Sequence, residues 1–374
     1  MKIAVIGLGG TGSAALRFLA QSGHEAVGYE RFRVGHTQGS SHGESRIIRY
    51  AYPSVIYTNL MGHAYPLWDE LESASGDELF VRCGGVFIDR PGSDMIRQVA
   101  DSLESAGLPH EILDPQEMER RFPVFRMDAD EVALWQPESG FLRPSACVAA
   151  NVRLAAIAGA RVLEETPVTG IRAAGDGVLV STPDSDIFYD RALITAGPWM
   201  AELLQQIDLP LTVTRQQVAY VKIAGDPGAF SPESMPVWID TGAPDFLYGF
   251  PTDGRIPGIK LAMHRFGEPF DPNRADRPVS IDEAAALVEY ANRRFHGLEF
   301  LTTYDMSCLY TVAPNEDFII DAVPDIPAAH FISGCSGHGF KFTVLLGRIA
   351  ADLALGQADK WDIEAFGIKS PAGS

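Results

Sequence analysis

Residues 2–12 of the chain read KIAVIGLGGTG, and this stretch decides the first part of the fold. Residues 2–6 predict a buried strand, the glycines that follow predict a tight turn, and residues 14–21 have helical spacing. Residues 25–29 predict a second short strand, which ends at Glu30. The stretch therefore predicts a β-α-β unit.

The glycine turn has the spacing and the position that a dinucleotide needs. Glycines let the backbone approach a pyrophosphate, and the N-terminus of the following helix favours its negative charge. Glu30 is placed to bind a ribose hydroxyl, which disfavours NADP, although it could also be an exposed acid after a strand. FAD and NAD both remain open on this motif. The residues expected to bind the dinucleotide here are Gly7, Gly9, Gly10, Thr11, Gly12, Glu30 and Arg31.

Length and composition limit the class of protein. The chain has 374 residues with 46% apolar and 21% charged residues, so we expect an ordered protein of two lobes. Its net charge of -19 argues against a nucleic acid or an anionic membrane as partner. No secretory signal or membrane span is visible, and the four cysteines form no CxxC pair. We therefore expect a cytoplasmic protein with reduced thiols, either a monomer or a weak homodimer.

The rest of the chain returns to α/β structure at its end. Strands are predicted at residues 192–195 and 330–333, and a second glycine-rich turn at 334–339 precedes an apolar helix at 343–355. Residues 213–266 read as β structure, and a capping box of Ser280 and Glu283 predicts a helix at 282–295. We infer a discontinuous nucleotide domain with a β-rich substrate lobe inserted in two pieces.

Residues 39–49, GSSHGESRIIR, combine small residues with two arginines three positions apart. On a helix this spacing would place Arg46 and Arg49 on one face, and a solvated basic turn of a helix is the ordinary interpretation. Residues 41–52 also resemble the flavin loop of the monomeric sarcosine oxidase and N-methyltryptophan oxidase family. The resemblance continues, in the same order, at residues 137–140, 248–251, 258–261, 308–311, 316–321 and 336–342.

This resemblance implies an α/β fold, with a Rossmann-like FAD-binding domain and an inserted β-rich substrate domain of mixed sheet and helices. We expect residues 1–80, 140–210 and 305–374 in the first domain and residues 81–139 and 211–304 in the second. The resemblance also implies a thioether bond between Cys308 and the flavin, for which a thiolate is the required nucleophile. Without it, a buried and inert cysteine would be the ordinary interpretation, which we keep for Cys83, Cys147 and Cys335.

The family match also implies roles for several polar residues. Arg49 and Lys341 would bind a substrate carboxylate, although both could pair with structural acids instead. Lys260 would promote the reaction with dioxygen, unless it is an ordinary strand lysine facing solvent. Tyr248 and His264 would line the substrate pocket and take part in catalysis together with Arg46, and His264 could equally be structural. Further residues expected at the cofactor are Ser40, Ser41, His42, Arg46, Ile47, Val168, Ala196, Gly197, Trp199, Gly337, His338, Gly339, Phe340 and Lys341.

The expected reaction is oxidation of an N-methyl α-amino acid, such as sarcosine or a bulkier N-alkyl amino acid, to an imine, with dioxygen reduced to hydrogen peroxide. The substrate would be a small molecule with a free carboxylate. Residues 53–58 and 245–247 depart from the family pattern, which puts sarcosine itself in doubt. The alternatives are a D-amino-acid or glycine oxidase with non-covalent FAD, a nicotinamide-dependent dehydrogenase, and a flavin-binding sensor without turnover.

Overall fold

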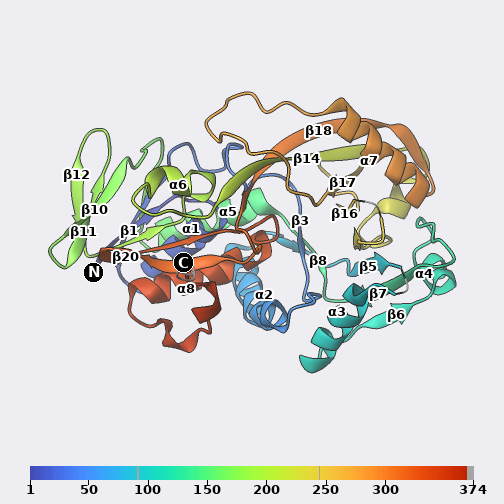
Figure 1. Cartoon of the computed structure of the whole chain (residues 1–374), viewed down its shortest axis with the longest axis horizontal. Helices are drawn as coiled ribbons and strands as arrows, with labels where there is room; N and C mark the ends of the chain where they lie inside the picture. The colour runs from blue at the N-terminus through green and yellow to red at the C-terminus, as the bar shows by residue number, and fades with distance from the viewer. Residues whose placement is uncertain (91, 244, 369–374) are drawn as a thin grey trace, which may run out of the picture.

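A computed structural model describes residues 1–90, 92–243 and 245–368, and it contains two large sheets in two halves of an elongated molecule (Figure 1). The six-stranded sheet has the order β19-β20-β13-β1-β2-β9, and all of its pairs are parallel except β19 with β20. Three separate parts of the chain build it. Its strands are β1 (Lys2–Ile6), β2 (Glu25–Tyr29), β9 (Arg161–Leu163), β13 (Arg191–Ile194), β19 (Ile319–Val323) and β20 (Ile326–Ser333).

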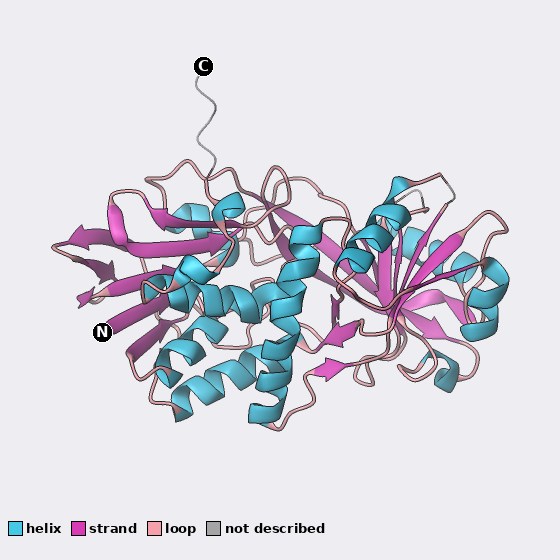
Figure 2. Cartoon of the chain, turned by 90° about the horizontal axis from the view of Figure 1, so that it is seen from below, coloured by secondary structure: helices cyan, strands magenta, loops and turns pink. Residues whose placement is uncertain are grey.

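Helices cover one face of this sheet, as Figure 2 shows for the half that holds the N-terminus. They are α1 (Gly10–Gln21), α2 (Val55–Ser75), α5 (Pro144–Ile157) and α8 (Thr343–Ala354). Helices α1 and α8 approach closely because Gly347 has no side chain, and a Cβ built there would lie 2.5 Å from the Cβ of Ala14. The opposite face packs against a small sheet of β10 (Gly170–Ala174), β11 (Gly177–Ser181) and β12 (Asp186–Tyr189).

The eight-stranded sheet has the order β18-β14-β17-β16-β15-β5-β7-β6 and forms the other half. Its strands are β5 (Gly85–Asp89), β6 (Glu111–Leu113), β7 (Val132–Gln136), β14 (Thr212–Ile223), β15 (Val237–Asp240), β16 (Leu247–Phe250), β17 (Ile259–Met263) and β18 (Leu298–Val312). Helices α3 (Asp94–Ser105), α4 (Pro115–Arg121) and α7 (Ile281–Arg294) pack against it, and the short helix α6 (Met200–Leu203) lies near the first sheet. A third small sheet contains β3 (Arg46–Ile48), β4 (Phe80–Val81) and β8 (Gly140–Leu142).

Local signals of the sequence are confirmed at several helix ends. Helix α1 begins at Gly10, so the last glycines of the turn belong to its first turn. The Ser280 side chain accepts a hydrogen bond from the Glu283 amide at the start of α7, as the capping box predicts. The prediction of a basic helical turn at residues 46–49 is wrong, because β3 pairs with β8 and makes this segment extended. The proposed domain boundaries stay a prediction, and β18 runs across the one at residues 304 and 305.

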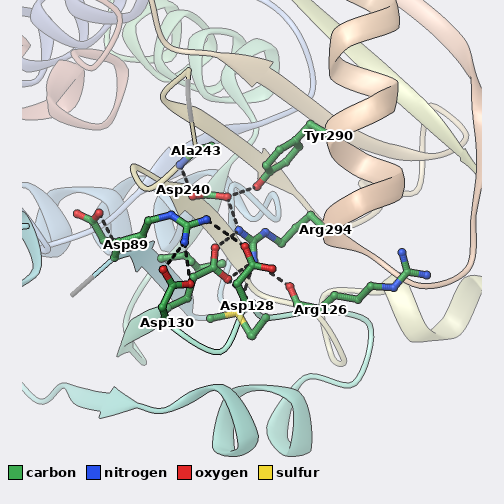
Figure 3. Close-up of polar contacts among 12 residues, drawn as sticks. Asp89, Arg126, Asp128, Asp130, Asp240, Ala243, Tyr290 and Arg294 are labelled. Atoms are coloured by element: carbon green, nitrogen blue, oxygen red, sulfur yellow. Dashed lines mark hydrogen bonds and ion pairs between the residues drawn. The ribbon is translucent and has the colours of Figure 1, made fainter.

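A buried ionic network ties α7 to the eight-stranded sheet (Figure 3). The Arg294 guanidinium donates to both carboxylate oxygens of Glu131 at 2.7 Å and to Asp240 at 2.8 Å. Tyr290, one turn earlier on α7, donates its hydroxyl to the same Asp240 carboxylate at 2.8 Å. The side chains of Glu131, Asp240 and Arg294 are only 1%, 0% and 7% exposed. Their charges are therefore compensated inside the protein and not by water.

No helix within the described ranges is both long and apolar enough to cross a bilayer.

Candidate functional site

A cavity of about 540 Å³ lies where β1, β2, β13 and β20 end at their carboxyl termini. Ligands of doubly wound sheets bind at this edge, since the loops that follow the strands meet there. The lining comes from the glycine turn, the segments after β2 and β13, the end of β18 and the second glycine-rich turn. Segments distant in sequence thus form one site.

The glycine turn fits a pyrophosphate. Gly7 has a φ of +90°, and a Cβ built there would lie 2.6 Å from the Thr195 carbonyl oxygen. A Cβ on Gly12 would lie 1.9 Å from the Gly7 carbonyl oxygen, so this glycine serves the contact between helix and strand and does not line the cavity. The N-cap residue Gly9 makes no side-chain hydrogen bond, and the first turn of helix α1 has no acidic residue. The Gly10 amide donates to the Ser41 hydroxyl at 3.0 Å, so the amides of Thr11 and Gly12 and the helix dipole are what remain for an anion.

Glu30 lines the cavity as a buried carboxylate with several donors. Its Oε2 accepts from the Leu8 amide at 2.9 Å, and its Oε1 accepts from the Phe32 amide at 3.0 Å. The His36 Nε2 lies 3.3 Å from the same Oε1. Burial by itself would raise the pKa of Glu30, but the hydrogen bonds from His36, Phe32 and Leu8 hold the pKa below its usual value. Glu30 is therefore an ionised acceptor, and the alternative of an exposed acid is wrong.

Most of the predicted cofactor residues line this cavity. Those that line it are Gly7, Gly9, Gly10, Thr11, Glu30, Arg31, Ser40, Ser41, Arg46, Val168, Ala196, Gly197, Trp199, Cys308, Gly337, Gly339 and Phe340. The structure places Gly12, His42, Ile47, His338 and Lys341 outside the lining. His42 is buried beside it, and burial together with the nearby charge of Arg46 lowers its pKa to about 3. It is therefore a neutral side chain at physiological pH.

Cys308 lines the cavity, and Lys260 lies outside the lining but within electrostatic range of Cys308 and Arg46. Cys308 lies on β18, is 7% exposed and lines the cavity together with Arg46. Lys260 on β17 is 3% exposed, and its Nζ donates to the Ser45 carbonyl oxygen at 2.8 Å and to the Ser45 hydroxyl at 3.2 Å. Burial and then repulsion by Arg46 lower its pKa to about 7. The alternative of a strand lysine facing solvent is wrong.

Arg46 is held in place by backbone acceptors. Its Nη1 donates to the Ser45 carbonyl oxygen at 2.9 Å and its Nη2 to the Ser40 carbonyl oxygen at 3.1 Å. Within the described ranges, Arg46, Arg49, Lys260 and Lys341 form no ion pair with a carboxylate. This part of the protein therefore gathers cations that no carboxylate contacts directly, inside a chain whose net charge is -19.

Arg49 and Lys341 meet at Tyr52. The Arg49 guanidinium lies 4.3 Å from the centre of the Tyr52 ring, and Lys341 donates to the Tyr52 hydroxyl at 2.8 Å. Lys341 also donates to the His338 carbonyl oxygen at 2.8 Å. Burial, and then repulsion by Arg49, hold the pKa of Lys341 well below its usual value. A carboxylate bound here would relieve both costs, because it supplies the missing negative charge. The alternative that both cations pair with structural acids is wrong.

An aromatic cluster surrounds His264. Its ring contacts Phe246 at 4.9 Å and Tyr310 at 5.9 Å between ring centres, and the Tyr248 and Tyr310 hydroxyl oxygens are 3.2 Å apart. Burial, and then the positive charges of Arg49 and Lys341, lower the pKa of His264 to about 4. His264 is therefore neutral near pH 7 and lies within electrostatic range of the two cations.

Sequence reasoning missed three residues and misplaced a fourth. Tyr52 follows Arg49 by three positions, and Tyr310 shares the alternation of β18 with Cys308, so both could have been found from spacing. Nothing in the sequence signalled His36. Cys335 was expected in the core, but it is half-buried and lines the cavity beside Gly339. The turn that carries it is open toward the cofactor site and not packed into the core.

Fold and site together define a protein with a dinucleotide-type cavity and a cluster of cations beside it. The family described as FAD dependent oxidoreductase matches residues 2–353, and the chain belongs to it. Monomeric sarcosine oxidase of Streptomyces avermitilis is 38% identical, covering 94% of this chain and 93% of that protein. N-methyl-L-tryptophan oxidase of Yersinia pestis (strain Pestoides F) is 31% identical, covering 97% of each.

Solved structures agree on the fold. NikD, an unusual amino acid oxidase essential for nikkomycin biosynthesis, superposes with a TM-score of 0.85 at 23% identity, covering 98% of this chain and 96% of that one. Glycine oxidase from Geobacillus kaustophilus gives a TM-score of 0.83 at 20% identity, covering 100% and 99%. The resemblance to the sarcosine and N-methyltryptophan oxidases, the α/β fold with a Rossmann-like domain, and the class of FAD-dependent amine oxidase are confirmed. The nicotinamide-dependent alternative is set aside by the family match.

Proposed function

We propose that this enzyme oxidises an N-methyl α-amino acid, or a bulkier N-alkyl amino acid, to the imine and reduces dioxygen to hydrogen peroxide. Bound FAD would supply the acceptor for the hydride equivalent that leaves the carbon next to the amine, and the route for the two electrons to dioxygen. One observation carries the proposal: two cations, the half-buried Arg49 and the buried Lys341, lie against one tyrosine without a carboxylate partner in the described ranges.

In this proposal the substrate carboxylate binds between Arg49 and Lys341. The guanidinium of Arg49 supplies a planar fork and the ammonium of Lys341 a point charge. Tyr52 contacts both side chains and so holds the two cations close to each other. The two cations repel each other when no anion is present, so the pocket selects ligands with a free carboxylate over simple amines. Neutral His264 and the Tyr248 hydroxyl then border the amine without adding charge.

The cofactor end fits FAD on the geometry of the chain itself. The glycine turn and the N-terminus of helix α1 would hold the pyrophosphate, and Glu30 would accept from a ribose hydroxyl. We propose that the Sγ of Cys308 carries the flavin as a thioether, since Cys308 lies on β18 and lines the cavity together with Arg46. In the turn after β20, the amides of Ser336 and His338 already donate to backbone oxygens. The amides of Gly337 and Gly339 are our candidates to face the flavin ring.

Lys260 would face the dioxygen that the enzyme reduces. Its ammonium is fixed by two oxygens of Ser45, so it requires no reorganisation when negative charge develops nearby. Arg46 and Lys260 together make this end of the cavity electropositive, which favours the reduction of a neutral molecule to an anion. The four cysteines are free thiols, in keeping with the cytoplasmic location that we propose.

Acid precipitation of the purified protein, followed by an absorbance spectrum of the redissolved pellet, tests the attachment. Yellow colour should stay with the polypeptide and be lost from the pellet of a Cys308→Ser variant. A screen of N-methyl and primary amino acids for peroxide, with decarboxylated analogues as controls, tests the substrate. Equal rates with the decarboxylated amines would refute the carboxylate site, and turnover of primary amino acids alone would favour the glycine oxidase alternative.

A further inference from the structure

His36 lies at the adenosine end of the cavity, outside every motif that the sequence singled out. It lines the cavity, and its ring packs against Phe32 at 4.8 Å between ring centres, which in turn contacts Trp199 at 5.4 Å. The His36 amide donates to the Arg33 carbonyl oxygen at 3.1 Å. Backbone and ring are therefore both fixed, and the imidazole has one orientation toward Glu30.

The hydrogen bonds of the ring determine its tautomer. The Gln38 amide donates to Nδ1 at 3.0 Å, so Nδ1 must carry a lone pair. The proton of the neutral ring then lies on Nε2, which is 3.3 Å from the Glu30 Oε1. A doubly protonated ring would lose the bond from Gln38, since both nitrogens would be donors. The Gln38 amide thus directs the Nε2 proton of His36 toward the Glu30 carboxylate.

With this donation in place, one acceptor position of the Glu30 carboxylate has no donor from the protein. A carboxylate has about four acceptor positions. The Phe32 amide and His36 fill Oε1, whereas Oε2 accepts from the Leu8 amide alone. The side chain of Glu30 is 7% exposed, so water has little access to the remaining position. One lone pair of Oε2 is therefore kept for a donor that comes from the cavity.

We propose that His36 is a positioning residue for FAD: its Nε2 proton fixes the Glu30 carboxylate so that Oε2 accepts from a ribose hydroxyl of the adenosine. The inference rests on the use of FAD by this family and does not depend on which amine is oxidised. His36 acts through Glu30 and not by a bond of its own to the nucleotide. Loss of His36 should therefore weaken the binding of FAD only when Glu30 is present.

The test measures FAD binding without turnover. In a Cys308→Ala background, where no thioether can form, quenching of flavin fluorescence gives the dissociation constant of FAD. His36→Ala should weaken binding roughly 10-fold, which corresponds to about 1.4 kcal/mol. His36→Gln, whose amide can reach Glu30, should stay within about 3-fold of the parent, whereas His36→Asn can accept from Gln38 but falls short of Glu30 and should behave like alanine.

A double-mutant cycle with Glu30→Ala distinguishes positioning of Glu30 by His36 from a structural role of His36 that does not involve Glu30. In that background His36→Ala should change the dissociation constant by less than about 2-fold, because the coupled partner is already gone. Equal losses from His36→Ala with and without Glu30, or equal binding by the glutamine and asparagine variants, would overturn the proposal. Absence of FAD binding in the Cys308→Ala parent would overturn it as well, whereas a failed substrate screen would leave these measurements unaffected. If the alanine variant does not fold, the glutamine and asparagine pair decides alone.

Discussion

Replacing Arg294 by methionine should destabilise the protein strongly. The change removes four hydrogen bonds from the guanidinium to oxygen atoms, two to Glu131, one to Asp240 and one to the Arg126 carbonyl, and a longer one to the Met127 sulfur. It leaves two carboxylates that are 1% and 0% exposed without a counter-charge. Breaking a buried ion pair from one side costs about 3–5 kcal/mol. Asp240 keeps the Tyr290 hydroxyl as a donor. We therefore expect the free energy of unfolding to fall by about 4 kcal/mol, and not by twice that value.

Urea unfolding followed by both circular dichroism and tryptophan fluorescence measures this loss, and two probes are needed because the molecule has two large sheets. The loss should be larger at pH 8 than at pH 5. Two unpaired buried carboxylates favour their protonated forms, so the folded variant binds protons that the unfolded chain releases, and stability falls as pH rises. Arg90→Met is the matched control, since Arg90 is 44% exposed and pairs with exposed aspartates.

A loss below about 1 kcal/mol, or one that does not depend on pH, would refute the reasoning about this network. The triple variant Glu131→Gln, Asp240→Asn, Arg294→Met should recover part of the stability, because it removes the stranded charges together with their partner. No recovery would mean that the packing of the Arg294 side chain, and not its charge, holds α7 to the sheet.

Three further predictions concern the site and the packing beneath it. Arg49→Lys should raise KM for the amino acid substrate by about 10-fold or more with a smaller effect on kcat, because one ammonium cannot reproduce the bidentate fork of a guanidinium. An unchanged KM would exclude Arg49 from the carboxylate site. The rate constant for reoxidation by dioxygen should fall as pH rises above about 7, where Lys260 with its pKa of about 7 loses its proton, and Lys260→Met should be slow and independent of pH in stopped-flow measurements. Gly347→Ala should lower the stability measured by thermal unfolding by about 1–3 kcal/mol, because the added methyl group pushes α8 away from α1. Gly356→Ala is the control for backbone strain alone, since its Cβ would meet no atom within 4 Å but its φ is +67°.

The sequence predicted those parts of the molecule that local rules decide. The turn at residues 7–12, the capped start of α7 at Ser280 and the strand before Gly334 follow from spacing, capping and apolar runs, which act within a few residues. The resemblance also brought together residues of the cavity lining that lie as far apart in sequence as Gly7 and Phe340, which no local rule could do. Segment 46–49 was misread as helical, because its pairing with β8 is a contact between distant parts of the chain.

The roles of Tyr52 and His36 depend on the third dimension in a different way. Tyr52 becomes important only because Lys341, near the other end of the chain, reaches its hydroxyl. His36 is defined by its tautomer, which the Gln38 amide selects through the exact course of the loop. Spacing from Arg49 could have singled out Tyr52 as a residue, but neither its contact with Lys341 nor the tautomer of His36 leaves a pattern in the sequence. The four cations of the site were each visible as residues, but their lack of carboxylate partners became visible only when the neighbours were placed.

The interleaved order of the six-stranded sheet has a consequence for how the protein is made. Its central pair β1 and β13 is separated by more than 180 residues, and β20 joins the sheet near the end of the chain. Contacts of such long range close slowly, since a large loop must be ordered before they form. The second glycine-rich turn follows β20 and lines the cavity, so the cavity cannot form until residues 334–339 have been synthesised. Removal of α8, which packs against α1, should therefore abolish flavin binding while leaving most of the eight-stranded sheet able to form.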